Sequence, residues 1–228
     1  SSDQYLLLAT KNGMVKKTPI ADYANIRKTG LIAMTLRDDD QLIEAKLIDA
    51  GEDIMIGTRN GMAIRFNETD VRVTGRSSMG VRGISLDVDD EVIGMQKLSQ
   101  GDYVLVVSEK GMGKLTHVDE FKAQKRGGKG LHCYRITEKT GRLVGFKLTS
   151  KEREIMLITN EGVIIRMSLK DAKDIGRNTS GVKFMNIDPD STTVIASIAK
   201  VRESTTEAYE AELAENEADP EESDELNS

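Results

Sequence analysis

The feature that most constrains this chain is an internal repeat of about 50 residues. Two series of glycines run in phase along it. In the first, a glycine follows a short apolar run and a turn residue at intervals of 48, 50 and 51 residues, at Gly13, Gly61, Gly111 and Gly162. In the second, the intervals are 50, 50 and 51 residues, at Gly30, Gly80, Gly130 and Gly181. The repeat divides residues 1–200 into four units, near 3–51, 52–100, 101–150 and 151–200.

Each unit is expected to contain four short strands, because apolar and β-branched runs alternate with turn residues. Asn12-Gly13 and Asn60-Gly61 are strong hairpin signals, since a type I′ turn needs positive φ at both central residues. The expected first strands, each followed by the turn and a second strand, are 5–10, 53–57, 103–108 and 154–159. The expected third strands follow the second glycine, at 31–36, 81–86, 131–137 and 182–187. The expected fourth strands close the units, at 42–48, 91–98, 142–149 and 192–200.

Four antiparallel strands in about 50 residues, repeated in series, predict an all-β fold. The blades of such a propeller-like array are four-stranded antiparallel sheets. A blade with two apolar faces must stack on its neighbours, so the blades are expected to succeed one another around an axis or a spiral. The ten methionines of the chain are expected to fill the core.

The units alternate between two forms. Units one and three carry a lysine three residues after the turn glycine, Lys16 and Lys114, whereas units two and four carry an arginine four residues after it, Arg65 and Arg166. Units two and four also share the loop pattern Gly-Arg-x-x-x-Gly-Val, at 75–81 and 176–182. This alternation indicates duplication of a two-unit segment.

Composition excludes several classes of protein. No apolar stretch approaches the roughly 20 residues of a membrane span, and the first 20 residues lack the basic start and apolar block of a signal peptide. The single cysteine, Cys133, excludes an internal disulfide framework and is typical of a reducing cytoplasm. Two histidines and one cysteine are too few for a structural zinc site. The absence of Trp argues against a stacking platform for single-stranded nucleic acid.

Charge is divided unevenly along the chain. Residues 201–228 hold 11 acidic residues and one basic residue, whereas residues 1–200 hold 31 basic and 27 acidic residues. The acidic tail has no apolar periodicity, so it is expected to be disordered. Two interpretations stay open: a solvated appendage, or an electrostatic competitor for whatever the basic body binds.

The loop before the second glycine of each unit carries basic residues at equivalent positions. They are Arg27, Lys28, Arg76, Lys125, Arg126, Lys129 and Arg177, with Lys183 and Arg82 just beyond. One cluster per blade predicts an array of positive charge along one rim, which suits duplex DNA because its affinity for proteins is mostly electrostatic. Gly127, Gly128 and Gly130 would let the backbone approach phosphate. The alternative is that these cations only keep the surface soluble.

Signals for base reading and for catalysis are weak. No recognition helix is evident, so DNA binding is expected to depend on phosphates and on bendability rather than on base sequence. His132 and Cys133 are neighbours on an expected strand, point to opposite faces and cannot form a dyad. We interpret both, together with His117, as filler of the core or surface. Acidic runs at 38–40 and 87–90 are interpreted as turns rather than as a metal site.

The heptapeptide Gln124-Lys125-Arg126-Gly127-Gly128-Lys129-Gly130 closely resembles the GyrA box, a basic, glycine-rich signature of the C-terminal domain of the DNA gyrase A subunit. Segments 12–18, 75–83 and 176–182 resemble the repeats of that family, and the acidic tail is also similar. The resemblance implies a β-pinwheel that wraps duplex DNA around its rim and so supports ATP-dependent negative supercoiling by the whole enzyme. It implies no catalytic site and no cofactor in this region, since the DNA-breaking tyrosine and the sites for ATP and Mg²⁺ lie elsewhere in the parent enzyme.

The resemblance also implies partners: the rest of the gyrase A subunit, together with the gyrase B subunit, in a cytoplasmic A2B2 heterotetramer, with duplex DNA and no membrane. Phosphate contacts are expected from the whole heptapeptide and from Arg76, Arg177, Arg27, Lys28, Lys183 and the hairpin cations Lys16, Lys17, Arg65, Lys114 and Arg166. The family's domain usually has six blades with the box in the first. Here the box-like copy is in the third of four units, which we interpret as a fragment lacking two blades.

Two alternative functions stay open. The first is the matching domain of the topoisomerase IV A subunit, whose box is degenerate or absent, so the intact heptapeptide favours gyrase. The second is a propeller-like protein–protein scaffold whose basic loops are incidental.

Overall fold

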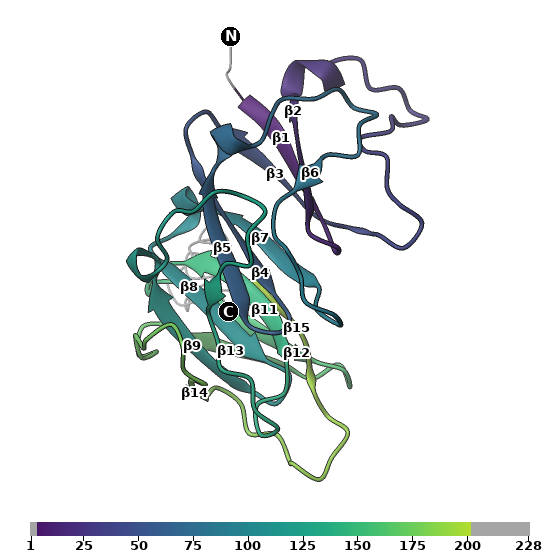
Figure 1. Cartoon of the computed structure of the whole chain (residues 1–228). Coiled ribbons are helices and arrows are strands. Elements are labelled where there is room, and N and C mark those ends of the chain that lie inside the picture. The colour runs from purple at the N-terminus through teal and green to yellow at the C-terminus, as the bar shows by residue number, and fades with distance from the viewer. Residues whose placement is uncertain (1–3, 202–228) are drawn as a thin grey trace, which may run out of the picture.

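The structure, a computed structural model, describes residues 4–201. These residues form short antiparallel strands and a few short 3-10 helices (Figure 1). The strands assemble into a series of antiparallel sheets, stacked in chain order, which confirms the predicted all-β, propeller-like array of blades. Three sheets have four strands, and the last has three within the described residues. The acidic tail, predicted to be disordered, lies outside these residues.

We number the sheets as blades 1 to 4. Blade 1 has the strand order β3 (Leu42–Asp49), β1 (Gln4–Thr10), β2 (Met14–Pro19) and β6 (Val81–Arg82). Blade 2 has the order β7 (Val92–Lys97), β4 (Asp53–Thr58), β5 (Met62–Asn67) and β10 (Leu131–His132). Blade 3 has the order β11 (Leu143–Thr149), β8 (Tyr103–Ser108), β9 (Met112–His117) and β14 (Val182–Lys183). Blade 4 has the order β15 (Ile195–Lys200), β12 (Glu154–Thr159) and β13 (Ile164–Ser168).

Four 3-10 helices connect the strands described here. They are η1 (Ile20–Tyr23), η2 (Glu68–Asp70), η3 (Leu98–Gln100) and η4 (Val118–Glu120). Three of them, η1, η2 and η4, directly follow the second strand of a unit and so lead into the loop that precedes the second glycine.

The outer strand of each complete blade comes from the next unit along the chain. Strand β6 belongs to the second unit but pairs with β2 of the first, β10 pairs with β5, and β14 pairs with β9. Our expectation that each unit builds a blade from its own four strands is therefore wrong at the third strand. In the first unit, the expected strand 31–36 is an irregular loop with exposed Ile32 and Leu36.

The exchanged strands are two residues long because a backbone contact ends each of them. The N–H groups of Gly83 and Ile84 both donate to the carbonyl of the turn glycine Gly13, at 2.8 and 3.3 Å. The same double contact recurs on the carbonyls of Gly61 and Gly111. Each of these turn glycines thus holds the chain of the following unit where it leaves the sheet.

Glycine is required where the chain enters each exchanged strand. Gly130 has φ +77°, and a Cβ atom there would lie 2.2 Å from the carbonyl oxygen of Ala63 in the neighbouring unit. Gly80 and Gly181 also have positive φ and approach a carbonyl almost as closely. The second glycine series therefore marks the points at which one unit crosses onto the sheet of its predecessor.

The hydrophobic core lies mainly between successive blades. One cluster joins the facing sides of blades 1 and 2 and includes Leu7 and Phe66. The next joins blades 2 and 3 around Phe146, and the third joins blades 3 and 4. The expectation that methionines fill the core is confirmed for Met55 and Met95, whereas Met79 is exposed.

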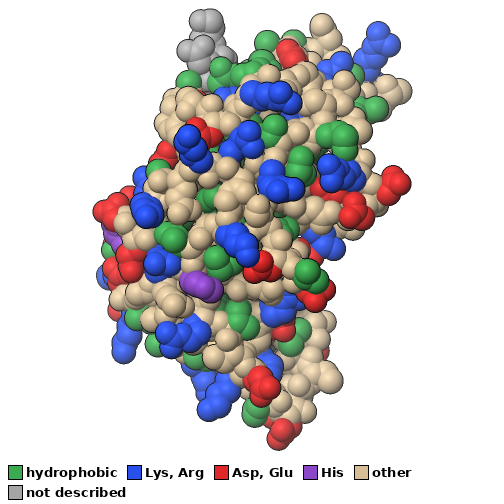
Figure 2. All heavy atoms as spheres, viewed as in Figure 1, with side chains coloured by type: hydrophobic (Ala, Val, Ile, Leu, Met, Phe, Trp, Pro, Cys, Tyr) green, Lys and Arg blue, Asp and Glu red, His purple; other side chains and the backbone are tan. Residues whose placement is uncertain are grey.

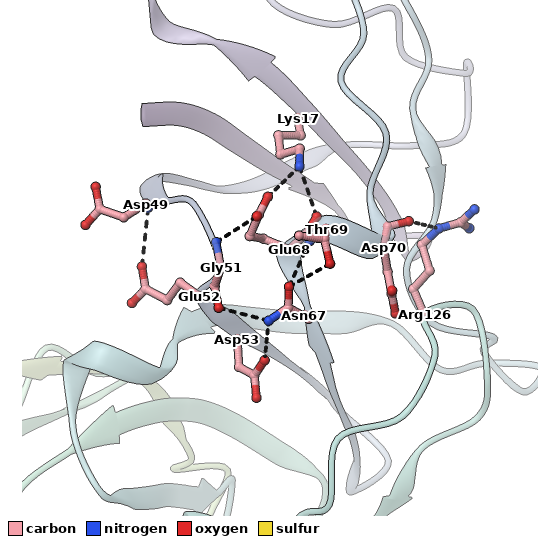
Figure 3. Close-up of polar contacts among 10 residues, drawn as sticks. All are labelled: Lys17, Asp49, Gly51, Glu52, Asp53, Asn67, Glu68, Thr69, Asp70 and Arg126. Atoms are coloured by element: carbon pink, nitrogen blue, oxygen red, sulfur yellow. Dashed lines mark hydrogen bonds and ion pairs between the residues drawn. The ribbon is translucent and has the colours of Figure 1, made fainter. Parts of the chain in front are cut away.

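One predicted phosphate contact, Lys17, is instead a buried link between two units. Its side chain is only 6% exposed and forms an ion pair with Glu68 of η2, whose carboxylate also accepts the N–H of Gly51 at 2.8 Å (Figure 3). Lys17 Nζ also donates to the Glu68 carbonyl at 3.1 Å and lies 4.7 Å from the centre of the Tyr5 ring. With its ammonium enclosed in this way, Lys17 has no access to DNA.

Substituting Gly130 tests the strand exchange. Gly130→Ala should lower the free energy of unfolding by more than the roughly 1–2 kcal/mol that left-handed backbone alone costs an L-residue, because its Cβ also collides with the Ala63 carbonyl. Gly30→Ala is the matched control, since Gly30 has φ +80° but no atom within 4 Å of a Cβ. Urea unfolding of both variants measures the difference, and equal losses would contradict the exchange.

Lys17→Met should lower the free energy of unfolding by about 3–5 kcal/mol, because it leaves the buried Glu68 carboxylate without its cation. Lys28→Met, at an exposed position, should change stability by no more than about 0.5 kcal/mol. Chemical denaturation compares the two variants. A Lys17 variant as stable as the Lys28 variant would show that the ion pair is not a structural link.

Candidate nucleic-acid interface

Three exposed residues stand at one position on the outer strands of successive blades. Each lies two residues after the second glycine and directly opposite a methionine of the preceding unit, in the pairs Met14–Arg82, Met62–His132 and Met112–Lys183. Because the register is the same in each pair, Arg82, His132 and Lys183 occupy the same place on blades 1, 2 and 3. We call these three residues the outer row.

A second row consists of the arginines four residues before the second glycine, Arg76, Arg126 and Arg177, which we call the arginine row. Arg126 donates from Nε to the carbonyl of Asp70 at 2.8 Å and from Nη1 to the carbonyl of Arg82 at 2.9 Å. Arg177 donates from Nη1 to the carbonyl of His132 at 2.8 Å. The guanidinium groups of Arg126 and Arg177 thus reach from their own loops to the outer strand of the previous blade, which joins the rims of neighbouring blades.

The arginine row keeps donors available for a ligand. A guanidinium has five N–H groups, and Arg126 uses two of them on the carbonyls of Asp70 and Arg82. Figure 3 shows Arg126 alongside Asp70 at the end of η2. The carbonyl contacts fix the plane of the group, and a fixed fork is the geometry that recognises phosphate.

A third row was not recognised in the sequence. Eight residues before the second glycine, units two, three and four carry the exposed cations Arg72, Lys122 and Lys173. Their intervals, 50 and 51 residues, match those of the glycines. We call these residues the loop row, and the outer, arginine and loop rows together the rim track. The periodicity of the loop row is a signal that could have found it from the sequence.

The heptapeptide forms the loop that precedes β10, and its backbone is tied to the previous unit. Gly127 donates its N–H to the Gly83 carbonyl at 2.6 Å and accepts the Ser85 hydroxyl at 2.7 Å, while Gly128 accepts the Ser85 N–H at 2.9 Å. The side chain of Lys125 is exposed, and Gln124 holds the loop through its N–H, which donates to the Arg65 carbonyl. The loop is therefore positioned chiefly by backbone contacts.

Lys129 is exposed and paired with Asp87 at 2.9 Å, with side chains 70% and 68% accessible. An ion pair this open contributes little to stability, so a phosphate can replace the carboxylate at little cost. Lys129 accordingly stays a candidate for a DNA contact.

The other predicted cations divide into surface and structural groups. Arg27, Lys28 and Lys183 are exposed, as expected. Arg65 is half-buried and is held by Asp53 and by the Phe121 carbonyl, at 2.9 and 3.2 Å.

Arg166 lies on the edge strand of blade 4 and pairs with Glu154. Lys16 and Lys114 are 1% and 0% exposed. The expectation that they contact phosphate is therefore wrong, as it is for Lys17.

One face of the molecule is rich in basic side chains (Figure 2). Figure 2 shows Lys and Arg side chains distributed down the length of the face on which Figure 1 labels β6 and β14. Asp and Glu side chains lie mostly toward the margins of this view (Figure 2). This face of the molecule therefore carries a basic strip, and the outer and arginine rows adjoin at two blades, where Arg126 and Arg177 bind the carbonyls of Arg82 and His132.

The three residues interpreted as filler, Cys133, His117 and His132, differ in burial and contacts. Cys133 is buried, and burial raises the pKa of its thiol to about 12, so the thiol stays protonated at neutral pH. His117 caps η4 by accepting the N–H of Asp119 at 3.2 Å. His132 belongs to the exposed outer row. Its position two residues after Gly130 in the sequence is the signal that could have placed it there.

The part of the chain that the structure describes contains no cluster of metal-binding side chains and no membrane-spanning helix. Within residues 4–201 no three His, Cys, Asp or Glu side chains come together in a way that could hold a metal ion. The described helices are all too short or too polar to cross a membrane.

Comparison with known proteins identifies the family. The sequence profile of the family described as "DNA gyrase C-terminal domain, beta-propeller" matches residues 4–49, 52–99, 102–150 and 153–200. The DNA gyrase A subunit of Ureaplasma parvum serovar 3 is 43% identical over 183 residues, which cover 80% of this chain and 22% of that protein. The chain thus spans less than a quarter of the length of this relative.

Solved structures agree with the sequence comparison. A DNA gyrase A C-terminal domain superposes with a TM-score of 0.79 and 28% identity over 89% of this chain and 67% of that one. The C-terminal domain of a DNA topoisomerase IV superposes with a TM-score of 0.83 and 27% identity over 94% and 67%. Since the profile matches all four units and the gyrase relative is 43% identical, this chain belongs to the family of DNA gyrase C-terminal domains.

Proposed function

We propose that this domain binds duplex DNA along the rim track and bends it around the blades, as the C-terminal domain of the gyrase A subunit. The observation that carries the proposal is the identical register of the outer row on three successive blades. Arg82, His132 and Lys183, at one position per blade, offer a regular series of side-chain N–H donors to the regular phosphates of a duplex. The arginine row adds a bridge between the rims of neighbouring blades.

The proposed binding is independent of base sequence. The rim track consists of Lys, Arg and one His on short strands and loops, and the described part of the chain has no helix longer than four residues to enter a major groove. Contacts to phosphate position DNA without reading it. Bending a site by 40–90° costs on the order of 1–6 kcal/mol, which several charge contacts per blade can offset.

The same proposal assigns the domain a place in the whole enzyme. The rest of the gyrase A subunit, with the gyrase B subunit, would complete an A2B2 assembly in the cytoplasm, with ATP, Mg²⁺ and the DNA-breaking tyrosine bound or located outside this region. DNA wrapped on the rim would then be presented for strand passage and negative supercoiling. The 43% identity to a gyrase A subunit favours this assignment over topoisomerase IV, whose C-terminal domain shares the fold.

A supercoiling assay separates the two enzymes. The parent protein, assembled with the other gyrase protein and supplied with ATP, should introduce negative supercoils into relaxed plasmid. Relaxation and decatenation without supercoiling would overturn the gyrase assignment and leave the topoisomerase IV alternative.

Neutralising the heptapeptide tests the proposed interface, because it removes Arg126 of the rim track together with its exposed neighbours Lys125 and Lys129. The triple substitution Lys125→Gln/Arg126→Gln/Lys129→Gln should weaken binding to duplex DNA and reduce the slope of log K against log salt by about 2–3, because each phosphate contact contributes roughly 0.9 to that slope. For comparison, about six contacts in the unmodified domain would give a slope near −5. Fluorescence anisotropy at several salt concentrations measures both quantities.

The matched control replaces three lysines that lie in turns outside the heptapeptide and the rim track, as Lys110→Gln/Lys139→Gln/Lys151→Gln. It makes the same change in net charge but should leave the slope nearly unchanged. Equal effects of the two triple substitutions would show that binding follows net charge rather than the positions of these cations. An unmodified domain with neither tight binding nor a steep salt slope would favour the scaffold alternative.

A further inference from the structure

Two buried ammonium groups lie directly beneath the loops that carry the arginine row. Lys114 Nζ donates to the carbonyls of Gly176 and Arg177, both at 2.7 Å, and to the Thr179 hydroxyl at 3.0 Å. Its side chain is fully buried. An ammonium has three N–H donors, and here each has an acceptor from one loop.

The arrangement occurs twice. Lys16, also buried, donates to the carbonyl of Arg76 and to the carbonyl of Ala33 at 2.5 Å. Both lysines stand three residues after a turn glycine, and both bind the carbonyl of an arginine four residues before the second glycine of the next unit. Two separate occurrences of one contact indicate that the lysine and the loop above it work as a pair.

The intervening units use a different support. At the position of Lys16 and Lys114, units two and four carry Ile64 and Ile165. Above Ile64 lies the heptapeptide, where a Cβ at Gly128 would meet the isoleucine Cδ1 at 3.8 Å. The described loops of the rim therefore alternate between support by an ammonium and support by an apolar side chain.

We propose that Lys16 and Lys114 are positioning residues for DNA binding, each holding an arginine-row loop so that its guanidinium and its backbone N–H groups face the rim. This inference rests on the proposed function. The carbonyl and the N–H of a trans peptide point in opposite directions. Drawing the carbonyls of Arg76 and Arg177 inward therefore turns the N–H groups of Ser77 and Asn178 outward, where they suit a phosphate.

Neighbouring side chains reinforce the loop at 176–181. The Lys114 ammonium lies 5.7 Å from the centre of the Tyr134 ring, and the Tyr134 hydroxyl donates to the Ser180 carbonyl. The side chain of Arg135 adds a bond to the carbonyl of Asn178 at 3.2 Å. The loop is thus fixed from below by the third unit before any DNA binds, which reduces the ordering cost of the complex.

A double-mutant cycle tests the inference. Lys114→Ile, which installs the residue of the alternate units, should weaken duplex DNA binding about three- to tenfold, as Arg177→Gln should, because one phosphate contact is lost in either case. The double variant should lose less affinity than the sum of the two single losses, because both residues act through one loop. Additive losses would show that Lys114 acts independently of Arg177 and would overturn the proposal.

Lys125→Gln is the matched control, because Lys125 lies on a loop supported by Ile64. Its effect should add to that of Lys114→Ile. Hydrogen exchange of residues 176–181 provides a readout without DNA: exchange should accelerate in Lys114→Ile and stay unchanged in Lys125→Gln. Unchanged exchange in Lys114→Ile would also overturn the proposal. If exchange changes as expected but the domain shows no salt-dependent affinity for DNA, only the proposed function is overturned.

A pH profile tests the same idea without altering Lys114, in case Lys114→Ile does not fold. Burial lowers the pKa of Lys114 to about 8, so this ammonium loses its charge as pH rises from 7 to 9. Affinity for duplex DNA should fall over that interval, and the fall should be smaller in Arg177→Gln. The ammonium faces Cys133, Glu120, Arg177 and Arg135, and the Cys133 thiol stays neutral because burial raises its pKa to about 12. Identical profiles for the two proteins would contradict the proposal.

Discussion

The rest of this structure depends on a contact made, in each complete blade, by the backbone carbonyl of one turn glycine. In each complete blade, the turn glycine between the first and second strands accepts two N–H groups from the next unit. That contact ends the exchanged strand after two residues and sends the chain back toward the core. The edge of every complete blade is therefore closed by its successor, and the apolar faces of both are brought together. Cohesion between blades comes from backbone exchange as well as from packing.

The exchange also builds the proposed interface. Because the outer strand of one blade and the loop that leads into it belong to the following unit, a cation in that loop lies next to the strand of the blade before it. Arg126 and Arg177 use this proximity to bind a carbonyl across the boundary. The basic strip thus continues from blade to blade because of the strand exchange. The third and fourth units each supply the outer strand of one blade and an arginine that binds the outer strand of the blade before it.

Much of this organisation could be predicted from the sequence. The glycine intervals predicted the number of units, and the apolar runs predicted the bounds of the first and fourth strands closely. The third strand could not be assigned to its blade, because a strand of two residues has no periodicity. It pairs with a strand of another unit, and the contact that ends it is to a backbone carbonyl, which leaves no mark in the sequence. The cations of the arginine row were found from their repetition, whereas the loop row and the burial of Lys16, Lys17 and Lys114 were not. The sequence does not show whether the ammonium of a lysine on a short strand is exposed to solvent or bound to a carbonyl. Its burial depends on the loop that folds over it.

Strand exchange has a consequence for synthesis of the chain. Blade 1 takes its last strand from residues 81 and 82, although its other three strands end by residue 49. A ribosome must therefore release more than thirty further residues before the first sheet is complete. Blades 2 and 3 likewise need residues 131–132 and 182–183 of the unit that follows them. The growing polypeptide always carries one unfinished edge, which moves toward the C-terminus as elongation proceeds.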